Sequence, residues 1–290
     1  MEKFTMNDTT IAFIGLGLIG GSLAKGIKKA RPDIRIMAYM RTRSKLEQAK
    51  KDGIVDVILD GIDEQLKQCD LIFLCTPVEY NAQYLSKIRS YLKPGALITD
   101  VGSTKTDIHK EILRQGLTDC FVGGHPMAGS EKTGYENATD HLLENAYYIV
   151  TPPEGFNQNG CGYGNISPKY SENVKRIIAV AQTVGAIPLV LDYKEHDTVV
   201  AAISHLPHLV ASSLVNLVKD SDSPAETMKQ VAAGGFKDIT RIASSSPEMW
   251  EQICMTNTEN IILMMKDYIS SLQDILSALE NRNGSYVHPV

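Results

Sequence analysis

Residues 11–24 read IAFIGLGLIGGSLA, and this stretch decides the expected fold. Four apolar residues of strand character lead into glycines in the spacing G-x-G-x-x-G, and a helix-forming segment follows at once. In that spacing the first glycine allows a tight turn, the second lets the backbone approach a pyrophosphate, and the third allows close helix–strand packing. The N–H groups at the start of the helix would face the phosphates. We therefore expect a nucleotide cofactor to bind here, at Gly15, Leu16, Gly17, Leu18, Ile19 and Gly20.

The composition is that of an ordinary globular protein. The 290 residues are 43% hydrophobic and 22% charged, and the length suggests two domains. A formal net charge of −5, without a basic block, argues against a nucleic-acid partner. Because no signal-peptide core and no apolar run approaching 18 residues is visible, we expect no membrane partner. Five widely spaced cysteines without a CxxC pattern indicate reduced thiols, so we expect a cytoplasmic protein.

Strand-like and helix-like segments alternate from the first glycines to residue 191. This alternation predicts right-handed βαβ units and a doubly wound sheet over residues 1–191. Ser44 and Glu47 have the spacing of a capping box, which predicts a helix start at Ser44. Residues 152–168 are rich in Gly, Asn and Pro and predict a surface loop. The expected strands are 11–14, 34–39, 55–59, 71–75, 96–101, 120–123, 147–150 and 187–191.

From Tyr193 onward the pattern is helical, which predicts a second, all-α domain over residues 192–290. Helices are expected at about 196–219, 224–233, 235–244, 247–254 and 258–280. The last of these carries a long apolar stripe. Because a stripe of this length usually needs a partner surface, we expect a homodimer. The stripe consists of Ile261, Met264, Met265, Tyr268, Ile269, Leu272, Ile275, Leu276 and Leu279.

The end of the second strand bears on the choice between NAD and NADP. An NAD site normally has a carboxylate about 20 residues after the glycines, where it binds the ribose 2′-hydroxyl. Here the chain reads YMRTRS over 39–44, with no carboxylate. Arg41, Thr42 and Arg43 could hold a 2′-phosphate, or they could form a solvated basic turn. Both cofactors stay open, with a lean to NADP. We add Thr76-Pro77, which closes the run at 71–75, to the cofactor site.

Two histidine clusters are candidates for chemistry. His125 follows two glycines near the end of an expected strand, where an imidazole could take a proton from an alcohol as hydride leaves. A structural histidine in a turn is the alternative. His205 and His208 lie three residues apart around Pro207, which is expected to kink the helix. A metal site would need a third ligand, and none is apparent, so we expect no metal.

A cationic cluster follows in GGFKDITR, residues 234–241. Lys237 and Arg241 lie four residues apart on one helix face, with Asp238 beside them. An arginine can bind a carboxylate with two hydrogen bonds. A surface ion-pair network is the alternative.

Together these motifs resemble those of the prephenate dehydrogenase family, whose members act in tyrosine biosynthesis. The motifs GLGLIGGSLA, DVGSTK, HPMAGSEKTG, SHLPH and GGFKDITRIASSSPEMW occur in the family's order over about residues 10–280. The resemblance implies a Rossmann-type domain followed by a helical dimerisation domain, with the active site between them. It also implies oxidative decarboxylation of prephenate to 4-hydroxyphenylpyruvate.

The resemblance assigns roles to individual residues. His125 would accept the proton of the ring hydroxyl as hydride passes to the nicotinamide, and Ser103 would hydrogen-bond that hydroxyl and His125. Arg241 would bind a substrate carboxylate, with Lys237 in the same substrate-binding set. The remaining assignments are a substrate pocket lined by His205, His208 and Ser130, a gating ion-pair set of Glu131, Asp238 and Arg241, and Trp250 reaching in from a partner subunit.

Several alternatives remain open. Arogenate differs from prephenate by an amino group in place of the keto group, and one carboxylate-binding arginine would serve both. A 3-hydroxyacid dehydrogenase or imine reductase would be expected to carry a different acid in place of SHLPH. A nucleotide-sensing protein with an inactive site is the non-enzyme alternative. It is disfavoured because a decayed site is expected to have lost at least one of Ser103, His125, His208 and Arg241. The sequence ends at Val290 without the regulatory domain of some relatives, so any feedback by tyrosine is expected to act at the active site.

Overall fold

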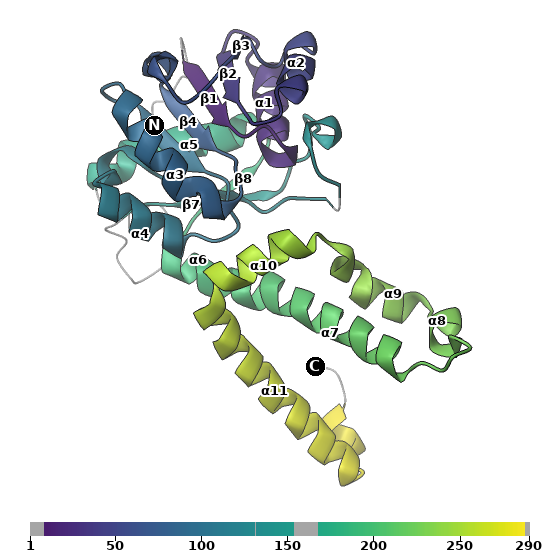
Figure 1. The fold of residues 1–290 in the computed structure, drawn as a ribbon. Helices are drawn as coiled ribbons and strands as arrows, with labels where there is room; N and C mark the ends of the chain where they lie inside the picture. Colours follow the sequence, from purple (N-terminus) through teal and green to yellow (C-terminus); the bar gives the residue numbers. More distant parts are fainter. Residues whose placement is uncertain (1–8, 131, 154–167, 288–290) are drawn as a thin grey trace. The chain divides into compact units, whose positions relative to one another are not determined.

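The computed structural model describes residues 9–130, 132–153 and 168–287. The chain forms two compact units, Met1–His196 and Asp197–Val290. The first contains two sheets with flanking helices, and the described part of the second is helical (Figure 1). Glu131 and most of the loop expected at 152–168 lie outside the described residues, so the expectations placed on them remain predictions.

A parallel sheet organises the first unit. The chain runs from β1 outward to β2 and β3, and then β4 pairs on the other side of β1. The order is therefore β3-β2-β1-β4-β5, and it reverses between β1 and β4. The crevice at the carboxyl ends of these two strands is where such sheets bind ligands. The strands are β1 (Thr10–Ile14), β2 (Arg35–Tyr39), β3 (Val57–Ile58), β4 (Leu71–Leu74) and β5 (Leu97–Asp100).

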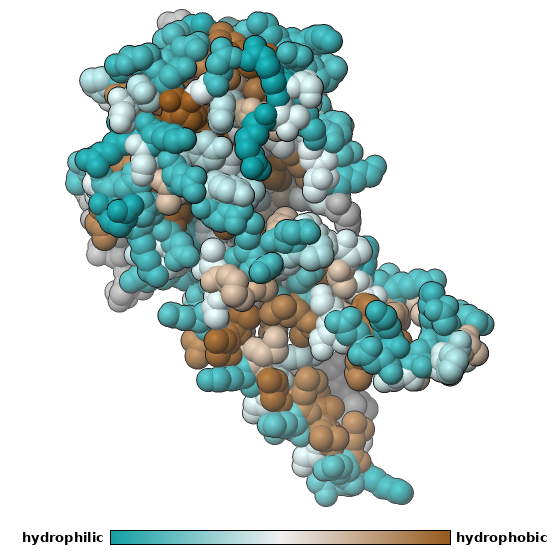
Figure 2. Space-filling model, viewed as in Figure 1, coloured by the Kyte–Doolittle hydropathy of each residue, from teal (hydrophilic) through white to brown (hydrophobic). Residues whose placement is uncertain are grey.

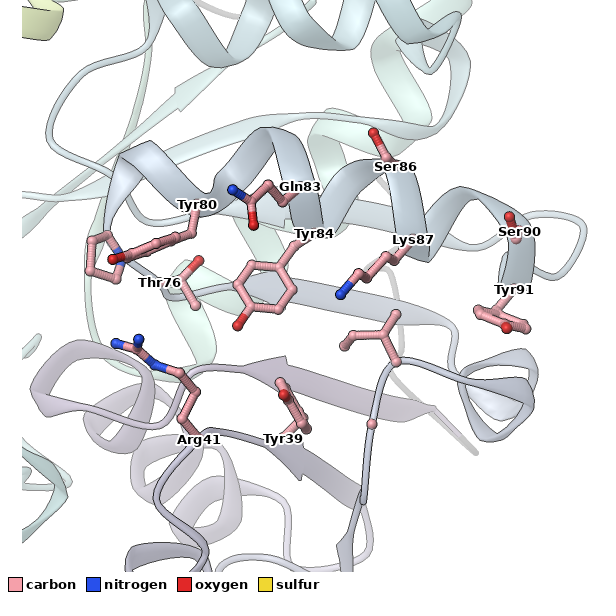
Figure 3. Close-up of a pocket in the computed structure, with 13 residues that line it drawn as sticks. Tyr39, Arg41, Thr76, Tyr80, Gln83, Tyr84, Ser86, Lys87, Ser90 and Tyr91 are labelled. Atoms are coloured by element: carbon pink, nitrogen blue, oxygen red, sulfur yellow. The ribbon is translucent and has the colours of Figure 1, made fainter.

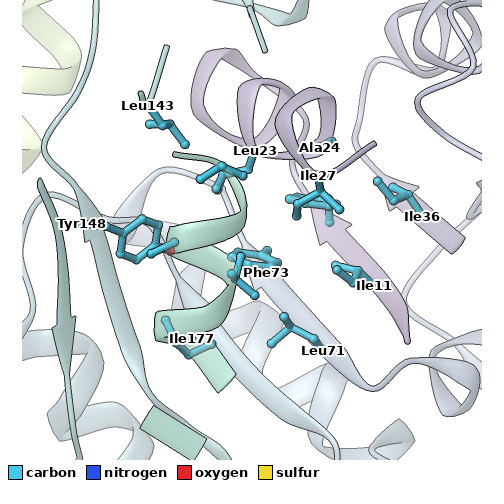
Figure 4. Packing of buried hydrophobic residues seen from close by; sticks show 14 of the residues in the cluster. Ile11, Leu23, Ala24, Ile27, Ile36, Leu71, Phe73, Leu143, Tyr148 and Ile177 are labelled. Atoms are coloured by element: carbon cyan, nitrogen blue, oxygen red, sulfur yellow. The ribbon is translucent and has the colours of Figure 1, made fainter. Parts of the chain in front are cut away.

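Two hydrophobic cores cover the two faces of this sheet. Ile11 and Phe13 of β1 belong to one core and Ala12 and Ile14 to the other, because successive side chains of a strand point to opposite faces. This explains why β1 is apolar throughout. Figure 4 shows the first core. Helices α1 (Leu18–Ala30), α2 (Arg43–Lys51) and α5 (Pro168–Thr183) contribute to the first core, and α3 (Asn81–Ile88) and α4 (Thr106–Gln115) to the second. The expected doubly wound fold is confirmed.

A second sheet departs from the expected alternation. It contains β6 (Gly123–Pro126), β7 (Tyr147–Thr151) and β8 (Ile187–Val190), and β6 runs antiparallel to β7. Between β6 and β7 the described residues form a 3₁₀ turn, Tyr135–Asn137, and no α-helix. A parallel return would need a crossover of a dozen or more residues, usually a helix, whereas an antiparallel return does not. The two sheets are linked by a bridge between Ile98 and Phe121.

The predicted capping box at Ser44 is wrong. Helix α2 begins at Arg43, and its N-cap, Thr42, makes no side-chain hydrogen bond to the helix. Ser44 is therefore already inside the helix. Glu47 lies 3.5 Å from the guanidinium of Arg43, one turn earlier, so it forms an ion pair there in place of a cap.

Six α-helices build or lead into the described part of the second unit. They are α6 (Tyr193–Val200), α7 (Leu206–Ser221), α8 (Thr227–Val231), α9 (Gly234–Thr240), α10 (Pro247–Thr256) and α11 (Thr258–Glu280). A π-helical turn, Ala201–His205, joins α6 to α7. Pro207 follows this turn. A proline has no N–H and collides with the carbonyl four residues earlier, so the wider turn accommodates it and the helix continues.

One helical stretch is long and apolar enough to span a membrane. It runs from Tyr193 to Ser221, with a mean hydropathy of 1.5 over an 18-residue window that is 28% buried. Polar residues such as Ser204, His205 and His208 interrupt this stretch, so it is not an uninterrupted apolar run. Length and composition alone do not distinguish such a helix from a core helix of a soluble protein.

Candidate active site

The turn between β1 and α1 has the geometry of a phosphate-binding loop. Gly15 has a φ of +93°, and a Cβ there would lie 2.6 Å from the carbonyl oxygen of Cys75, so only glycine fits. Gly17 is the N-cap of α1, and nothing lies within 4 Å of where its Cβ would be. No acidic side chain occupies the first turn of α1. The positive end of this helix therefore faces open space that suits a pyrophosphate.

The other residues of this turn differ in role. Leu16 is fully buried in the first hydrophobic core, so only its backbone is available to a cofactor. Leu18 and Ile19 are partly buried in the first turn of α1. Gly20 packs its backbone against the carbonyl oxygen of Gly15, since a Cβ on Gly20 would lie 2.7 Å from that atom.

A pocket of about 680 Å³ opens beside β2, β4 and α3 (Figure 3). Arg41, Thr76 and Pro77, three of the expected cofactor residues, line it together with Tyr80 and Tyr84. The Arg41 guanidinium lies over the Tyr80 ring, 5.4 Å from its centroid. The lining residues include Arg41 and Lys87 and no carboxylate. This pocket has the aromatic walls and positive charge that suit the adenosine end of a dinucleotide, including a phosphorylated one.

The structure separates the two arginines of the basic turn. Arg43 forms an ion pair with Asp60 and a longer one with Glu47, which neutralise its charge. Thr42 is exposed and caps α2 without a side-chain bond. Of the two arginines, Arg41 therefore lines the pocket and Arg43 does not.

The residues immediately before Ser103 and His125 donate backbone hydrogen bonds to the same buried carboxylate. Asp100, at the end of β5, accepts hydrogen bonds from the backbone N–H groups of Gly102 at 2.9 Å and Gly124 at 3.2 Å. These glycines directly precede Ser103 and His125. The ammonium of Lys105 forms an ion pair with Asp100, and both side chains have no solvent exposure. A Cβ on Gly124 would lie 2.7 Å from the Asp100 carbonyl oxygen, so this close approach requires glycine before His125.

A second histidine contacts His125. The Nδ1 atom of His125 lies 2.8 Å from the Nε2 atom of His196, and the two rings meet edge to face. His196 belongs to α6 and has no solvent exposure, whereas His125 is partly buried. The sequence analysis did not identify His196. Its contact with His125 joins residues 71 positions apart, and no local pattern shows it.

The second unit brings three other predicted residues together. Trp250 stacks on His208, with ring centroids 3.6 Å apart, and meets His205 edge to face at 6.0 Å. The Asn257 amide donates to Nδ1 of His205 at 3.1 Å and to the Asp197 carbonyl at 2.7 Å. His205 therefore carries its proton on Nε2 when it is neutral. Burial lowers the pKa of His208.

This aromatic cluster also contains buried polar atoms. Within the described residues, Nδ1 of His208 and Nε1 of Trp250 are buried without a hydrogen-bond partner. The resemblance implied that Trp250 reaches the active site from a partner subunit, whereas here Trp250 packs on His208 of its own chain. The role across subunits stays a prediction.

The charged candidates lie on the surfaces of their units. Lys237 and Asp238 are exposed on α9, and Arg241 is exposed at the start of the following 3₁₀ turn, Arg241–Ser244. Ser130 is exposed, and its hydroxyl accepts a hydrogen bond from the Lys132 N–H at 2.9 Å. Glu131, the remaining member of the expected gating set, lies outside the described residues. Over the described ranges, no group of three His, Cys, Asp or Glu side chains could hold a metal ion.

Comparisons with known proteins point to one family. Residues 23–160 match the family model described as prephenate dehydrogenase, nucleotide-binding domain. Residues 192–289 match the model described as prephenate dehydrogenase, dimerization domain. The chain is also 37% identical to prephenate dehydrogenase from Bacillus subtilis over 278 residues, which is 94% of this chain and 71% of that protein.

Two solved structures are similar along most of the chain. One is prephenate dehydrogenase from A. aeolicus in complex with hydroxyphenyl propionate and NAD⁺, with a TM-score of 0.83 and 30% identity, covering 96% of this chain and 93% of that one. The other is arogenate dehydrogenase from Synechocystis, with a TM-score of 0.80 and 28% identity, covering 97% of this chain and 95% of that one.

Proposed function

The chain belongs to the prephenate dehydrogenase family and is an oxidoreductase, and from that membership we propose that it converts prephenate to 4-hydroxyphenylpyruvate in tyrosine biosynthesis. Prephenate and NAD(P)⁺ would give 4-hydroxyphenylpyruvate, carbon dioxide and NAD(P)H. The observation that carries this proposal is that the unit with the phosphate-binding turn also contains Ser103 and His125, each directly after a glycine whose N–H donates to the buried Asp100 carboxylate.

The turn with Gly15, Gly17 and Gly20 would hold the pyrophosphate of the dinucleotide, whose nicotinamide would supply the acceptor for the hydride of the ring carbon that bears the hydroxyl. His125 takes the hydroxyl proton, and Ser103 hydrogen-bonds the same oxygen and fixes its direction. Loss of the ring carboxylate as carbon dioxide then leaves an aromatic phenolate, and the proton held on His125 returns to its oxygen to give the phenol of 4-hydroxyphenylpyruvate. Because this step is strongly favourable, the protein mainly has to orient the hydride and remove one proton.

We assign substrate binding chiefly to the second unit. Arg241 would bind a substrate carboxylate through two charge-assisted hydrogen bonds, with Lys237 and Asp238 beside it. His205, His208 and Trp250 would line the substrate pocket, and the buried nitrogen atoms of His208 and Trp250 would hydrogen-bond polar groups of the substrate. Ser130, an exposed residue of the first unit, stays a candidate for substrate binding.

Arogenate is the second candidate substrate. The similarity to a solved arogenate dehydrogenase over 97% of this chain favours keeping it. The proposed Arg241 contact would serve either molecule, because the carboxylates of the two are alike. Discrimination between prephenate and arogenate would depend on which protein groups face the keto or amino group of the substrate.

For the cofactor, we propose that NADP⁺ is preferred to NAD⁺. The support is the pocket beside β2, which includes Arg41 and Lys87 and no carboxylate. A carboxylate after the second strand would accept a hydrogen bond from the ribose 2′-hydroxyl of NAD⁺ and would repel the 2′-phosphate of NADP⁺. A cation at that place favours the phosphate. Arg43 would contribute little, because Asp60 and Glu47 already pair with it.

We also propose that the chain is a homodimer through its helical unit. The support is the match to a family dimerization domain and the apolar stripe on α11, much of which is exposed in the single chain. Homodimer interfaces are more apolar than the rest of a protein's surface, which suits such a stripe. It would also account for the apolar composition of the helical stretch Tyr193–Ser221 without a membrane.

The test is formation of reduced nicotinamide by the purified chain, with prephenate and arogenate each combined with NAD⁺ and NADP⁺. Turnover of prephenate is expected, with NADP⁺ the better cofactor. Turnover of arogenate alone would leave the family assignment in place and replace prephenate with arogenate as the assigned substrate. No turnover in any combination, from folded protein that still binds cofactor, would contradict the enzymatic proposal and favour a cofactor-sensing protein.

A further inference from the structure

We propose that His196 is a positioning residue that holds His125 in the tautomer able to accept a proton at Nε2. The inference rests on the proposed role of His125 as the base. It assigns a task to a fully buried imidazole on α6 that neither the sequence motifs nor the proposed reaction uses.

The contact between the two rings is short and joins two separate elements. His125 Nδ1 and His196 Nε2 are 2.8 Å apart, a normal hydrogen-bond distance, and the ring planes meet at 68°. His125 is on β6, and Asp100 holds the backbone of the preceding glycine. His196 is in the first turn of α6, where its own N–H bonds to the Asp192 carbonyl at 2.8 Å. The backbones of both partners are thus fixed independently.

The position of one proton decides whether His125 can act as a base. In a neutral imidazole one ring nitrogen donates a hydrogen bond and the other accepts one. If His125 donates from Nδ1 to His196, its Nε2 carries a lone pair and can take the substrate proton. If His196 donates instead, Nε2 of His125 is already protonated. The base role therefore requires His196 to accept at Nε2 and to carry its own proton on Nδ1.

The same contact also affects the charged state. After His125 takes the substrate proton, its Nδ1–H still donates to a neutral His196, and a donor with positive charge makes the stronger hydrogen bond. If both rings were protonated, both facing nitrogens would be donors, so the pair holds one added proton and not two. The charged and titratable groups near His196 on its own segment are Asp192, Tyr193, Lys194, Glu195 and Asp197, and His109 stacks on Tyr193. On the side of His125, Asp100, Lys105 and the buried Tyr148 hydroxyl lie beside Gly124.

Two substitutions at His196 test the proposal. His196→Leu fills the space without a hydrogen-bond acceptor, so we expect kcat to fall about 100-fold with KM for prephenate and cofactor changed by less than about threefold. The acid limb of the kcat–pH profile is expected to move to lower pH, because the protonated His125 loses its acceptor. His196→Gln keeps an amide oxygen that can accept from Nδ1, so it is expected to recover about tenfold of the lost kcat. An unchanged acid limb, or no recovery with glutamine, would overturn the proposal.

The matched control is His109→Gln, which replaces another buried histidine of the same unit. His109 stacks on Tyr193, in the same helix as His196, with ring centroids 4.3 Å apart. The His109→Gln variant therefore shows what a general loosening of α6 packing does to the enzyme. We expect a lower melting temperature, with kcat and the acid limb close to those of the unmodified chain. A loss of kcat equal to that of His196→Leu would mean that α6 packing, and not His196, is responsible.

A measurement on the unmodified chain avoids the risk that a variant fails to fold. Imidazole ¹⁵N shifts distinguish protonated from unprotonated ring nitrogens, and His125→Asn identifies the signals of His125. We expect Nδ1 protonated and Nε2 unprotonated in neutral His125, and the reverse would contradict the inference. Activity measurements separate the role of His196 from the proposed base role of His125, on which it rests. Normal activity in His125→Asn would remove the base role itself, whereas loss in His125→Asn with normal activity in His196→Leu would remove only the role of His196.

Discussion

Asp100 is the residue that joins the two candidate catalytic side chains, and it does so through the backbone. Its carboxylate holds the N–H groups immediately before Ser103 and His125, and Lys105 neutralises it without exposure to water. A shift of this carboxylate would therefore move both side chains together. Positioning of this kind matters because small displacements in a site can cost large factors in rate.

Removing the charge of Lys105 is expected to destabilise the first unit. Lys105→Met would leave the carboxylate of Asp100 buried without its counter-charge, which typically costs about 3–5 kcal/mol. Urea unfolding followed by circular dichroism would measure this change in the free energy of unfolding. The double variant Asp100→Asn with Lys105→Met removes both charges and is expected to recover part of the loss. A stability within about 1 kcal/mol of the unmodified chain for Lys105→Met would contradict this account.

Removing the proposed base is expected to slow the chemical step. His125→Asn should lower kcat by about 10²–10⁴-fold, the usual scale for losing a general base, while cofactor binding stays unchanged. Steady-state kinetics with prephenate, together with fluorescence titration of the reduced cofactor, would measure both. Near-normal turnover would exclude His125 from the mechanism.

Removing the proposed carboxylate ligand is expected to weaken substrate binding. Arg241→Gln should raise KM for prephenate by about 10- to 100-fold, because hydrogen bonds to a charged group contribute about 1.5–3 kcal/mol. Lys229→Gln is the control, since Lys229 is also an exposed cation of the second unit and pairs with Glu226. An unchanged KM for Arg241→Gln would mean that the carboxylate binds elsewhere.

At the scale of elements, the turn from β2 into α2 carries two arginines in different environments. Arg41 lines the pocket and lies over Tyr80, whereas Arg43 is paired with Asp60 and Glu47. Arg41→Gln should therefore raise KM for NADP⁺ by about tenfold or more with a smaller change for NAD⁺, since the lost contact is with the 2′-phosphate. Arg43→Gln should change the KM for NADP⁺ and the KM for NAD⁺ very little. Equal effects of Arg41→Gln on the two cofactors would exclude a 2′-phosphate contact.

The elements also show what the sequence can reveal. The glycine turn and the helices of the second unit were predictable, because turn geometry and helical periodicity depend on neighbouring residues. The antiparallel β6 was not, since its direction depends on a missing crossover helix. The start of α2 was misplaced by one residue. At the site, the motifs identified His125, but its contact with His196 and the Asp100–Lys105 pair depend on the tertiary fold.

For the whole molecule, the apolar stripe of α11 predicts the assembly state. Figure 2 shows apolar residues along the α11 region of this chain. Leu272 and Leu276 are 45% and 55% exposed there. Replacing both with Glu is expected to give monomers in sedimentation velocity, because buried charges would oppose association. Ser270→Glu adds a charge to another side of α11 and is expected to stay dimeric. A persistent dimer in the double variant would place the interface elsewhere.

The same apolar stripe links stability to abundance. With the α11 surface covered by a second copy, unfolding would require the two chains to separate, so mass action would favour the folded state as the chain becomes more concentrated. Each tenfold dilution would cost about 1.4 kcal/mol per dimer, and the melting temperature would fall accordingly. A cell that makes little of this chain would therefore hold a more fragile protein than a cell that makes much of it.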